Sequence, residues 1–255
     1  DNGIGLHFLR HGYYNPWEMD NNIARLVDMR MKWSVVLYTS PEQLATVAGK
    51  FKETGIMVVW RKYIRPFQRY DGWGRDVEIL RNLGLAPYMQ LYNEPSLEQE
   101  WVEYGPIDKG LFLENLLQAA WDVYHAGGYV GLQFLDERWL VDALLFFKER
   151  GAEEIFQKMF FVPHCYGLNH PPGYQEDIHG ALGFLHHARL FRWYLGFVPP
   201  MIVGEGGWVI GSDEDKRYPA ITDELHRDYH LEVFNWFRTG KLSNGQELPD
   251  YLFAF

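Results

Sequence analysis

The strongest constraint on the fold of this chain is a regular alternation of short apolar runs with longer segments of helical periodicity. The short runs are rich in β-branched and aromatic residues, and residues 56–60 are apolar throughout, as expected for a parallel strand covered on both faces. Strands and helices that alternate in this way predict repeated β/α units around a parallel sheet. We predict eight strands, at residues 4–9, 34–38, 56–60, 87–92, 129–135, 159–164, 201–204 and 251–255.

Helix-capping signals lie between these runs. Ser40 is a cap residue followed by Pro41 at the first helical position and by Gln43 three residues after the cap, so we predict a helix start there. Asp136 is predicted to cap a helix that Gly151 ends. These boundaries support the division of the chain into β/α units.

Chain length then predicts one domain. The 255 residues match the usual size of a (β/α)8 TIM barrel, an α/β fold, so we expect a single catalytic domain over residues 1–255. The chain stops at Phe255, at or inside the eighth predicted strand, and the eighth helix is missing from this sequence. Either the chain is part of a longer polypeptide, or another element covers that side of the barrel.

Composition limits the classes of partner. The net charge of −10 disfavours nucleic-acid phosphates, and the apolar runs are shorter than the ~18 residues of a membrane span. Cys165 is the single cysteine, which excludes an intrachain disulfide and a cysteine-rich zinc site. We expect a carbohydrate substrate, no cofactor and no metal, and the oligomeric state stays open. The N-terminal residues show no leader pattern, so the compartment is open between secreted and cytoplasmic, with secreted slightly favoured.

Two carboxylates stand where predicted strands end, the place where barrels of this kind carry their active sites. Glu94 follows the fourth strand within Asn93-Glu94-Pro95, and Glu205 follows the seventh within a glycine-rich turn. We expect both side chains to project into one crevice above the barrel. Flanking glycines let backbone and ligand approach Glu205 closely.

Asn-Glu-Pro at the end of strand four and a glutamate at the end of strand seven resemble the clan A retaining glycoside hydrolases, which include cellulases, mannanases and β-glycosidases. The resemblance implies cleavage of β-glycosidic bonds by double displacement, with the two carboxyl groups about 5–5.5 Å apart. Glu205 is then the nucleophile and Glu94 the general acid/base. Asn93 is implied to hydrogen-bond the sugar 2-hydroxyl.

Further binding residues follow from the same resemblance. His164 and Tyr166 share a face of the sixth strand, and the resemblance implies that Tyr166 donates its hydroxyl to Glu205 while His164 binds sugar or orients a carboxylate. The family usually has an arginine after strand two, where this chain has Tyr38-Thr39-Ser40. Arg61, directly after strand three, substitutes for it or forms a salt bridge at the rim. Other subsite-lining candidates are His7, Arg10, Trp60, Gln133, Asp136, Tyr174 and Trp208, with Trp60 or Trp208 replacing the strand-eight tryptophan of many relatives.

Three alternatives remain. A metal-dependent barrel hydrolase would use His7, His11, His164 and Asp136. Such sites generally contain a His-x-His motif on strand one, whereas His7 and His11 are four residues apart. A non-catalytic sugar-binding barrel could keep the fold without the activity. A phosphate-binding barrel is disfavoured because Glu205 would repel an anion. The sequence identifies neither the sugar nor its linkage, and we expect endo action in an open groove.

Overall fold

The computed structural model describes residues 2–8 and 16–255. The contacts within the chain divide it into two compact units. One, called the six-strand unit below, is Gly5–Phe161, and the other, called the C-terminal unit, is Asp1–Ile4 with Val162–Phe255. No helix in the described residues is long and apolar enough to cross a bilayer.

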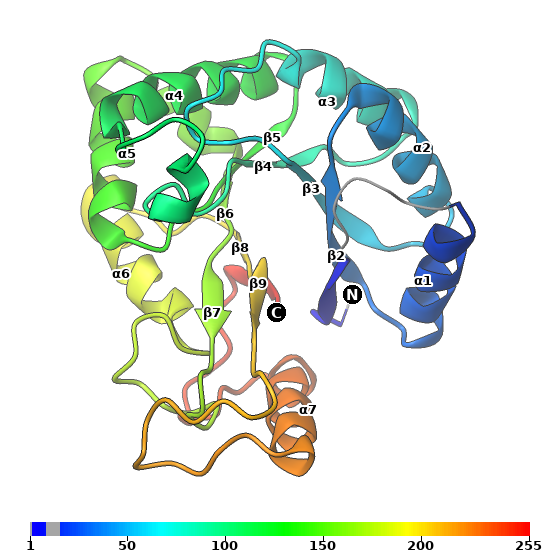
Figure 1. Ribbon diagram of the computed structural model, residues 1–255, viewed down its shortest axis with the longest axis vertical. Helices are drawn as coiled ribbons and strands as arrows, with labels where there is room; N and C mark the ends of the chain where they lie inside the picture. Colours follow the sequence, from blue (N-terminus) through cyan, green and yellow to red (C-terminus); the bar gives the residue numbers. More distant parts are fainter. Residues whose placement is uncertain (1, 9–15) are drawn as a thin grey trace. The chain divides into compact units, whose positions relative to one another are not determined.

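The six-strand unit is a parallel sheet covered by helices. Each strand pairs in parallel with the next one along the chain, from β1 to β6, and α1 to α5 lie on one face of this sheet (Figure 1). The elements, in chain order, are β1 (Gly5–Phe8), α1 (Pro16–Asp28), β2 (Trp33–Tyr38), α2 (Pro41–Phe51), β3 (Met57–Lys62), α3 (Trp73–Asn82), β4 (Tyr88–Leu91), η1 (Glu98–Trp101), α4 (Lys109–His125), β5 (Tyr129–Leu132), α5 (Glu137–Glu149), η2 (Glu153–Lys158) and β6 (Met159–Phe161).

The C-terminal unit contains two pairs of parallel strands. β8 pairs with β10, and the short β7 pairs with β9. Its elements are β7 (His164–Tyr166), α6 (Phe184–Leu195), β8 (Met201–Ile202), β9 (Glu205–Gly207), α7 (Asp223–Thr239) and β10 (Leu252–Ala254).

The predicted fold class is confirmed. Parallel strands alternate with helices, and the order β1-β2-β3-β4-β5-β6-β8-β10 follows the chain, as in a (β/α)8 TIM barrel. Every predicted strand overlaps an observed one. The proposal that residues 1–255 form a single domain stays a prediction.

Two of the strand boundaries that differ from the predictions affect the placement of predicted site residues. Arg61 and Lys62 are the last two residues of β3 instead of following it, because they stay in register with Leu37 and Tyr38 of β2. The predicted sixth strand ends at Phe161 and resumes as β7 at His164. Pro163 lies in this break, and a proline has no backbone N–H to continue a ladder.

The helix boundaries confirm the capping predictions. The Ser40 hydroxyl accepts a hydrogen bond from the Gln43 backbone N–H, and α2 begins at Pro41. Asp136 accepts hydrogen bonds from the N–H groups of residues 138 and 139 at the start of α5. Gly151, with φ of +66°, follows the end of α5 in the left-handed conformation that favours glycine.

A buried polar cluster joins the carboxyl ends of β2 and β3 to α3. The fully buried Asp76 accepts hydrogen bonds from the hydroxyls of Tyr38, at 2.8 Å, and Tyr70, at 3.2 Å. The ammonium of Lys62 lies 3.9 Å from the centre of the Tyr70 ring and donates to the Thr39 carbonyl. Burial raises the pKa of Asp76 and lowers that of Lys62. The cluster ties the β3–α3 connection to the sheet.

Candidate active site

The residues predicted for the active site are divided between the two units, and each group is described within its own unit. The six-strand unit holds His7, Trp60, Arg61, Asn93 and Glu94, and the C-terminal unit holds His164, Tyr166, Glu205 and Trp208. Arg10 and His11, named as a subsite residue and as a metal ligand of the rival site, lie outside the described residues.

Glu94 occupies a strained turn directly after β4. Tyr92 and Glu94 have φ values of +57° and +41°, in the left-handed region that costs non-glycine residues about 1–3 kcal/mol each. The buried Gln133 holds the turn, because its side-chain oxygen accepts the Glu94 backbone N–H at 2.5 Å. Glu94 is only 8% exposed. Strain of this kind, held by a buried partner, is typical of functional sites.

Asn93 lies between these two strained residues. Its side-chain oxygen is 3.5 Å from the amide nitrogen of the fully buried Gln90, which donates to it. That contact orients the Asn93 amide, whose nitrogen can donate to a ligand. The predicted contact with a sugar 2-hydroxyl stays a prediction.

His7 and Arg61 meet on the sheet. Nη1 of Arg61, on β3, lies 3.4 Å from Nε2 of His7, on β1. The two side chains therefore come from the same face of the sheet, across β2. Whether Arg61 takes the place of the arginine that the resemblance leads us to expect after strand two stays a prediction.

Trp60 lies on the opposite face of β3 from Arg61, because successive strand residues alternate. Its indole is 1% exposed and packs edge-on against Phe51 of α2, with ring centres 6.1 Å apart. This corrects the prediction that Trp60 lines a sugar subsite. The ring fills the layer between the sheet and α2.

Glu205 and its predicted partners lie on the ladder of β7 and β9. His164 is in register with Glu205, and Tyr166 with Gly207. The Tyr166 hydroxyl donates a hydrogen bond of 2.5 Å to Oε2 of Glu205, as the family resemblance implies. Nε2 of the buried His164 lies 4.0 Å from Oε1 of Glu205. A hydrogen bond to the ionised form of a carboxyl group stabilises its charge.

The glycines that follow Glu205 serve the packing of the protein itself. A Cβ on Gly206 would stand 2.7 Å from the carbonyl oxygen of Cys165 on β7. Gly207 has a φ of +90°, and a Cβ there would stand 2.6 Å from the ring of His230. The expected close approach at these glycines is therefore made, in this structure, by β7 and α7.

Trp208 is also a packing residue. It is 5% exposed, its indole N–H donates to the His170 carbonyl at 2.7 Å, and it contacts the rings of Tyr229 and His230 on α7. A Cβ on Gly167 would overlap the indole. This corrects the prediction that Trp208 replaces the strand-eight sugar platform.

A polar junction that the sequence analysis missed joins the loops after β7 and β9. Nε2 of His170 lies 3.0 Å from Oδ2 of Asp215, and the His170 ring stacks on Tyr174 at 3.9 Å. Asn169 donates to the Asp215 carbonyl and accepts its N–H. The partners are 45 or 46 residues apart, and no periodicity in the sequence relates them.

Asp136, a ligand of the rival metal site and a predicted subsite residue, lies at the start of α5 and is exposed. Both capping hydrogen bonds of α5 end on Oδ1 of Asp136, so that carboxylate is engaged at the helix start. The subsite role and the metal-ligand role of Asp136 stay predictions. Gln133, also named as a subsite residue, instead supports the Glu94 turn.

Comparison with known proteins finds no matching family model and no match among curated proteins. Among solved structures, a β-glycosidase is similar at 12% identity, covering 87% of this chain and 73% of its own, with a TM-score of 0.48. N-acetylneuraminate lyase from Proteus mirabilis has 12% identity, coverage of 98% and 79%, and a TM-score of 0.46. D-psicose 3-epimerase from Clostridium cellulolyticum has 11% identity, coverage of 93% and 98%, and a TM-score of 0.46. The similar structures thus include a glycosidase, a lyase and an epimerase, and the activity has to be argued from the residues of this chain.

Proposed function

We propose that this protein is a retaining glycoside hydrolase that cleaves β-glycosidic bonds of an oligo- or polysaccharide, with Glu205 as nucleophile and Glu94 as general acid/base. The observation that carries the proposal is the hydrogen bond from the Tyr166 hydroxyl to Oε2 of Glu205 on the β7–β9 ladder. A nucleophilic carboxylate has to be held in a fixed orientation, and a phenol donor on the adjacent strand fixes one of its oxygens by a hydrogen bond.

Glu94 suits the second role in a different way. Its turn is strained, its backbone is held by Gln133, and its side chain is largely removed from solvent. A general acid must keep its position while its proton moves to the departing oxygen. Asn93, oriented by Gln90, is the donor proposed for the sugar hydroxyl next to the reacting carbon.

The proposed reaction has two displacements. An oxygen of Glu205 attacks the anomeric carbon, the glycosidic C–O bond breaks, and Glu94 gives its proton to the departing oxygen. Glu94, now ionised, then takes a proton from water, which attacks the anomeric carbon and releases Glu205. The chemistry requires the two carboxyl groups to come within about 5–5.5 Å of each other.

Hydrolysis of aryl β-glycosides, β-glucan and β-mannan by three purified variants tests the proposal. We expect Glu205→Ala and Glu94→Ala to lose at least about 10²–10⁴-fold in kcat, because each lacks a group that takes part in bond breaking. Glu53→Ala, which removes an exposed carboxylate between α2 and β3, should keep full activity.

Azide separates the two roles. In Glu205→Ala the small anion should restore turnover of an activated aryl glycoside and give a glycosyl azide of inverted configuration. In Glu94→Ala it should give the retained configuration. Full activity of Glu205→Ala without azide would overturn the mechanism. A wild type inactive on every substrate would favour the sugar-binding barrel, and loss of activity with a chelator would favour the metal-dependent hydrolase.

A further inference from the structure

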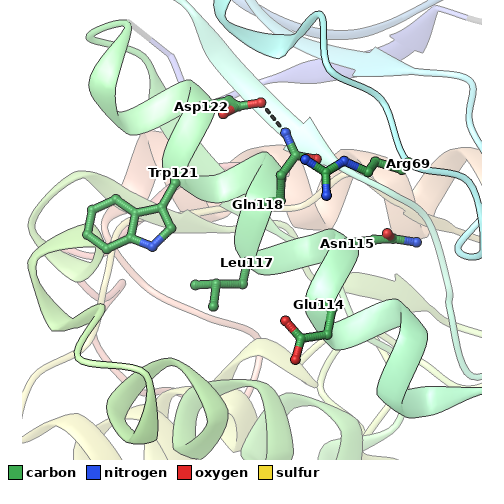
Figure 2. A pocket seen from close by; sticks show the side chains of 7 residues that line it. All are labelled: Arg69, Glu114, Asn115, Leu117, Gln118, Trp121 and Asp122. Carbon is green, nitrogen blue, oxygen red and sulfur yellow. Dashed lines mark hydrogen bonds between the residues drawn. The ribbon is translucent and has the colours of Figure 1, made fainter.

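A groove of about 340 Å³ runs along α4 in the six-strand unit, and none of the residues predicted for catalysis lines it. Figure 2 shows its walls: Glu114, Leu117, Gln118, Trp121 and Asp122 come from α4, and Arg69 comes from the β3–α3 connection. The volume falls in the range of small-molecule sites. A spacing of four residues puts Glu114, Gln118 and Asp122 in one row on the helix.

Trp121 gives the groove an aromatic surface. One indole face stacks on His125, with ring centres 4.9 Å apart and planes 9° from parallel. Its other ring contact in the described chain, with Tyr124, is edge-on. The second indole face therefore carries no stacked ring, while the first is fixed by its neighbour.

The polar groups of the groove include both donors and acceptors that are not used internally. Oε1 of Gln118 is buried and has no hydrogen-bond partner in the described residues, while its amide nitrogen donates to Asp122 (Figure 2). The Nε of Arg69 donates to Asp71 at 2.8 Å, and the exposed guanidinium keeps its terminal nitrogens for other acceptors. A buried acceptor without a partner is costly unless a ligand or water donates to it.

The charges of the groove favour a neutral ligand. Arg69 is balanced by Asp71, and Glu114 forms an ion pair with Arg150, which leaves the carboxylate of Asp122 in excess. Hydroxyl groups can donate to the Gln118 and Asp122 oxygens and accept from Arg69, and the C–H face of a sugar ring can cover an indole. A simple anion would meet Asp122, and an apolar ligand would leave these polar groups without partners.

We propose that the groove of Arg69, Glu114, Gln118, Trp121 and Asp122 is a second, non-catalytic binding site for a neutral saccharide chain. The choice of a saccharide rests on the proposed function, whereas the groove does not involve Glu94 or Glu205. A site of this kind would hold a polysaccharide on the protein surface and raise its concentration near the catalytic residues.

Affinity electrophoresis through gels containing β-glucan, xylan or β-mannan tests the proposal with the full chain. We expect at least one polysaccharide to retard the wild type, and Trp121→Ala to weaken that binding about ten-fold. Trp193→Ala, which removes a tryptophan of α6 that is 83% exposed, is the matched control and should bind like the wild type. Gln118→Ala should weaken binding several-fold and serves as a second variant if Trp121→Ala does not fold. Equal retardation of the wild type and both groove variants, or no retardation by any polysaccharide, would overturn the proposal.

A spectroscopic readout and a catalytic variant complete the design. The indole N–H signal that disappears in Trp121→Ala should shift when a soluble oligosaccharide is added to the wild type. Glu94→Gln should keep the binding that depends on Trp121. Binding that depends on Trp121, without any hydrolysis, would refute the proposed activity and support the groove as a binding site. Hydrolysis together with binding that does not depend on Trp121 would support the activity and refute the groove. An unmoved Trp121 signal at saturating ligand would contradict the groove.

Discussion

Tyr166 and His164, which both come from β7, lie close to the carboxylate of Glu205, so the strand beside Glu205 helps to hold it. Tyr166 donates directly, and His164 is fixed by burial. A partner on a ladder is more precisely placed than one on a free loop, because backbone pairing sets its position. The position of Glu94 is fixed in a different way, by a strained backbone turn that the buried Gln133 holds through a hydrogen bond.

At this scale we predict that Tyr166→Phe lowers kcat/KM about 10–100-fold, because a hydrogen bond to a charged group contributes about 1.5–3 kcal/mol. Loss of the donor also disfavours the ionised nucleophile, so the acidic limb of the kcat/KM profile should move to higher pH. Steady-state kinetics from pH 4 to 9 measure both effects. Tyr129→Phe, which alters an exposed residue at the start of β5, should leave the profile in place. An unmoved acidic limb in Tyr166→Phe would argue that the phenol has only a structural role.

Among the helices, α6 carries a buried titratable group. His187 is 2% exposed, and its Nδ1 lies 3.1 Å from the Gly183 carbonyl oxygen, so the ring donates there. Burial lowers the pKa of His187 to about 3, below its ordinary value of 6.5. The folded protein keeps this ring neutral over a pH range in which the unfolded chain protonates it.

This difference predicts a pH dependence of stability. Between pH 6.5 and about 3 the unfolded state binds one more proton at residue 187 than the folded state, so the free energy of unfolding falls as the pH falls through this range. Above pH 6.5 the ring is neutral in both states, so residue 187 no longer makes the free energy of unfolding depend on pH. Urea unfolding at pH 4 to 8 should give a shallower pH dependence for His187→Gln, which cannot gain the charge. At pH 8 the difference in unfolding free energy between His187→Gln and the wild type reflects only the altered packing. The measurement at pH 8 is therefore the control for those at lower pH. Parallel curves for the two proteins would contradict the assignment.

The whole molecule has the strand order of a (β/α)8 barrel, whereas its internal contacts divide it into two compact units. Our prediction of a single domain has a direct thermodynamic consequence. A barrel closed on itself has no edge strand, and opening part of it exposes backbone groups and core along the whole sheet.

We therefore expect one calorimetric transition, with the van't Hoff enthalpy equal to the calorimetric enthalpy. The fragment Gly5–Phe161 expressed alone should show no cooperative unfolding. In a single-domain barrel these six strands need the remaining strands to complete the sheet and its core. Two resolved transitions, or a cooperative transition of the fragment near that of the full chain, would show two domains.

The sequence by itself determined the eight strands of the larger sheet and their order, the starts of α2 and α5, and the two glutamates as the candidate catalytic pair. These features depend on local patterns: apolar runs, capping residues and polar residues at strand ends. The hydrogen bond from Tyr166 to Glu205 was predicted from the family resemblance. The strand periodicity adds only that His164 and Tyr166 lie on the same face, because they are two residues apart.

The tertiary structure decided which aromatic rings are buried and which contacts join distant segments. Sequence reasoning treated Trp60 and Trp208 as sugar platforms, whereas α2 and α7 cover them. The junction of His170 with Asp215, the support of Glu94 by Gln133 and the groove along α4 likewise join residues that no local pattern relates. The physical reason is that burial and hydrogen-bond partners depend on what packs against a residue. Packing is a property of the folded chain, while periodicity and capping are already present in short segments.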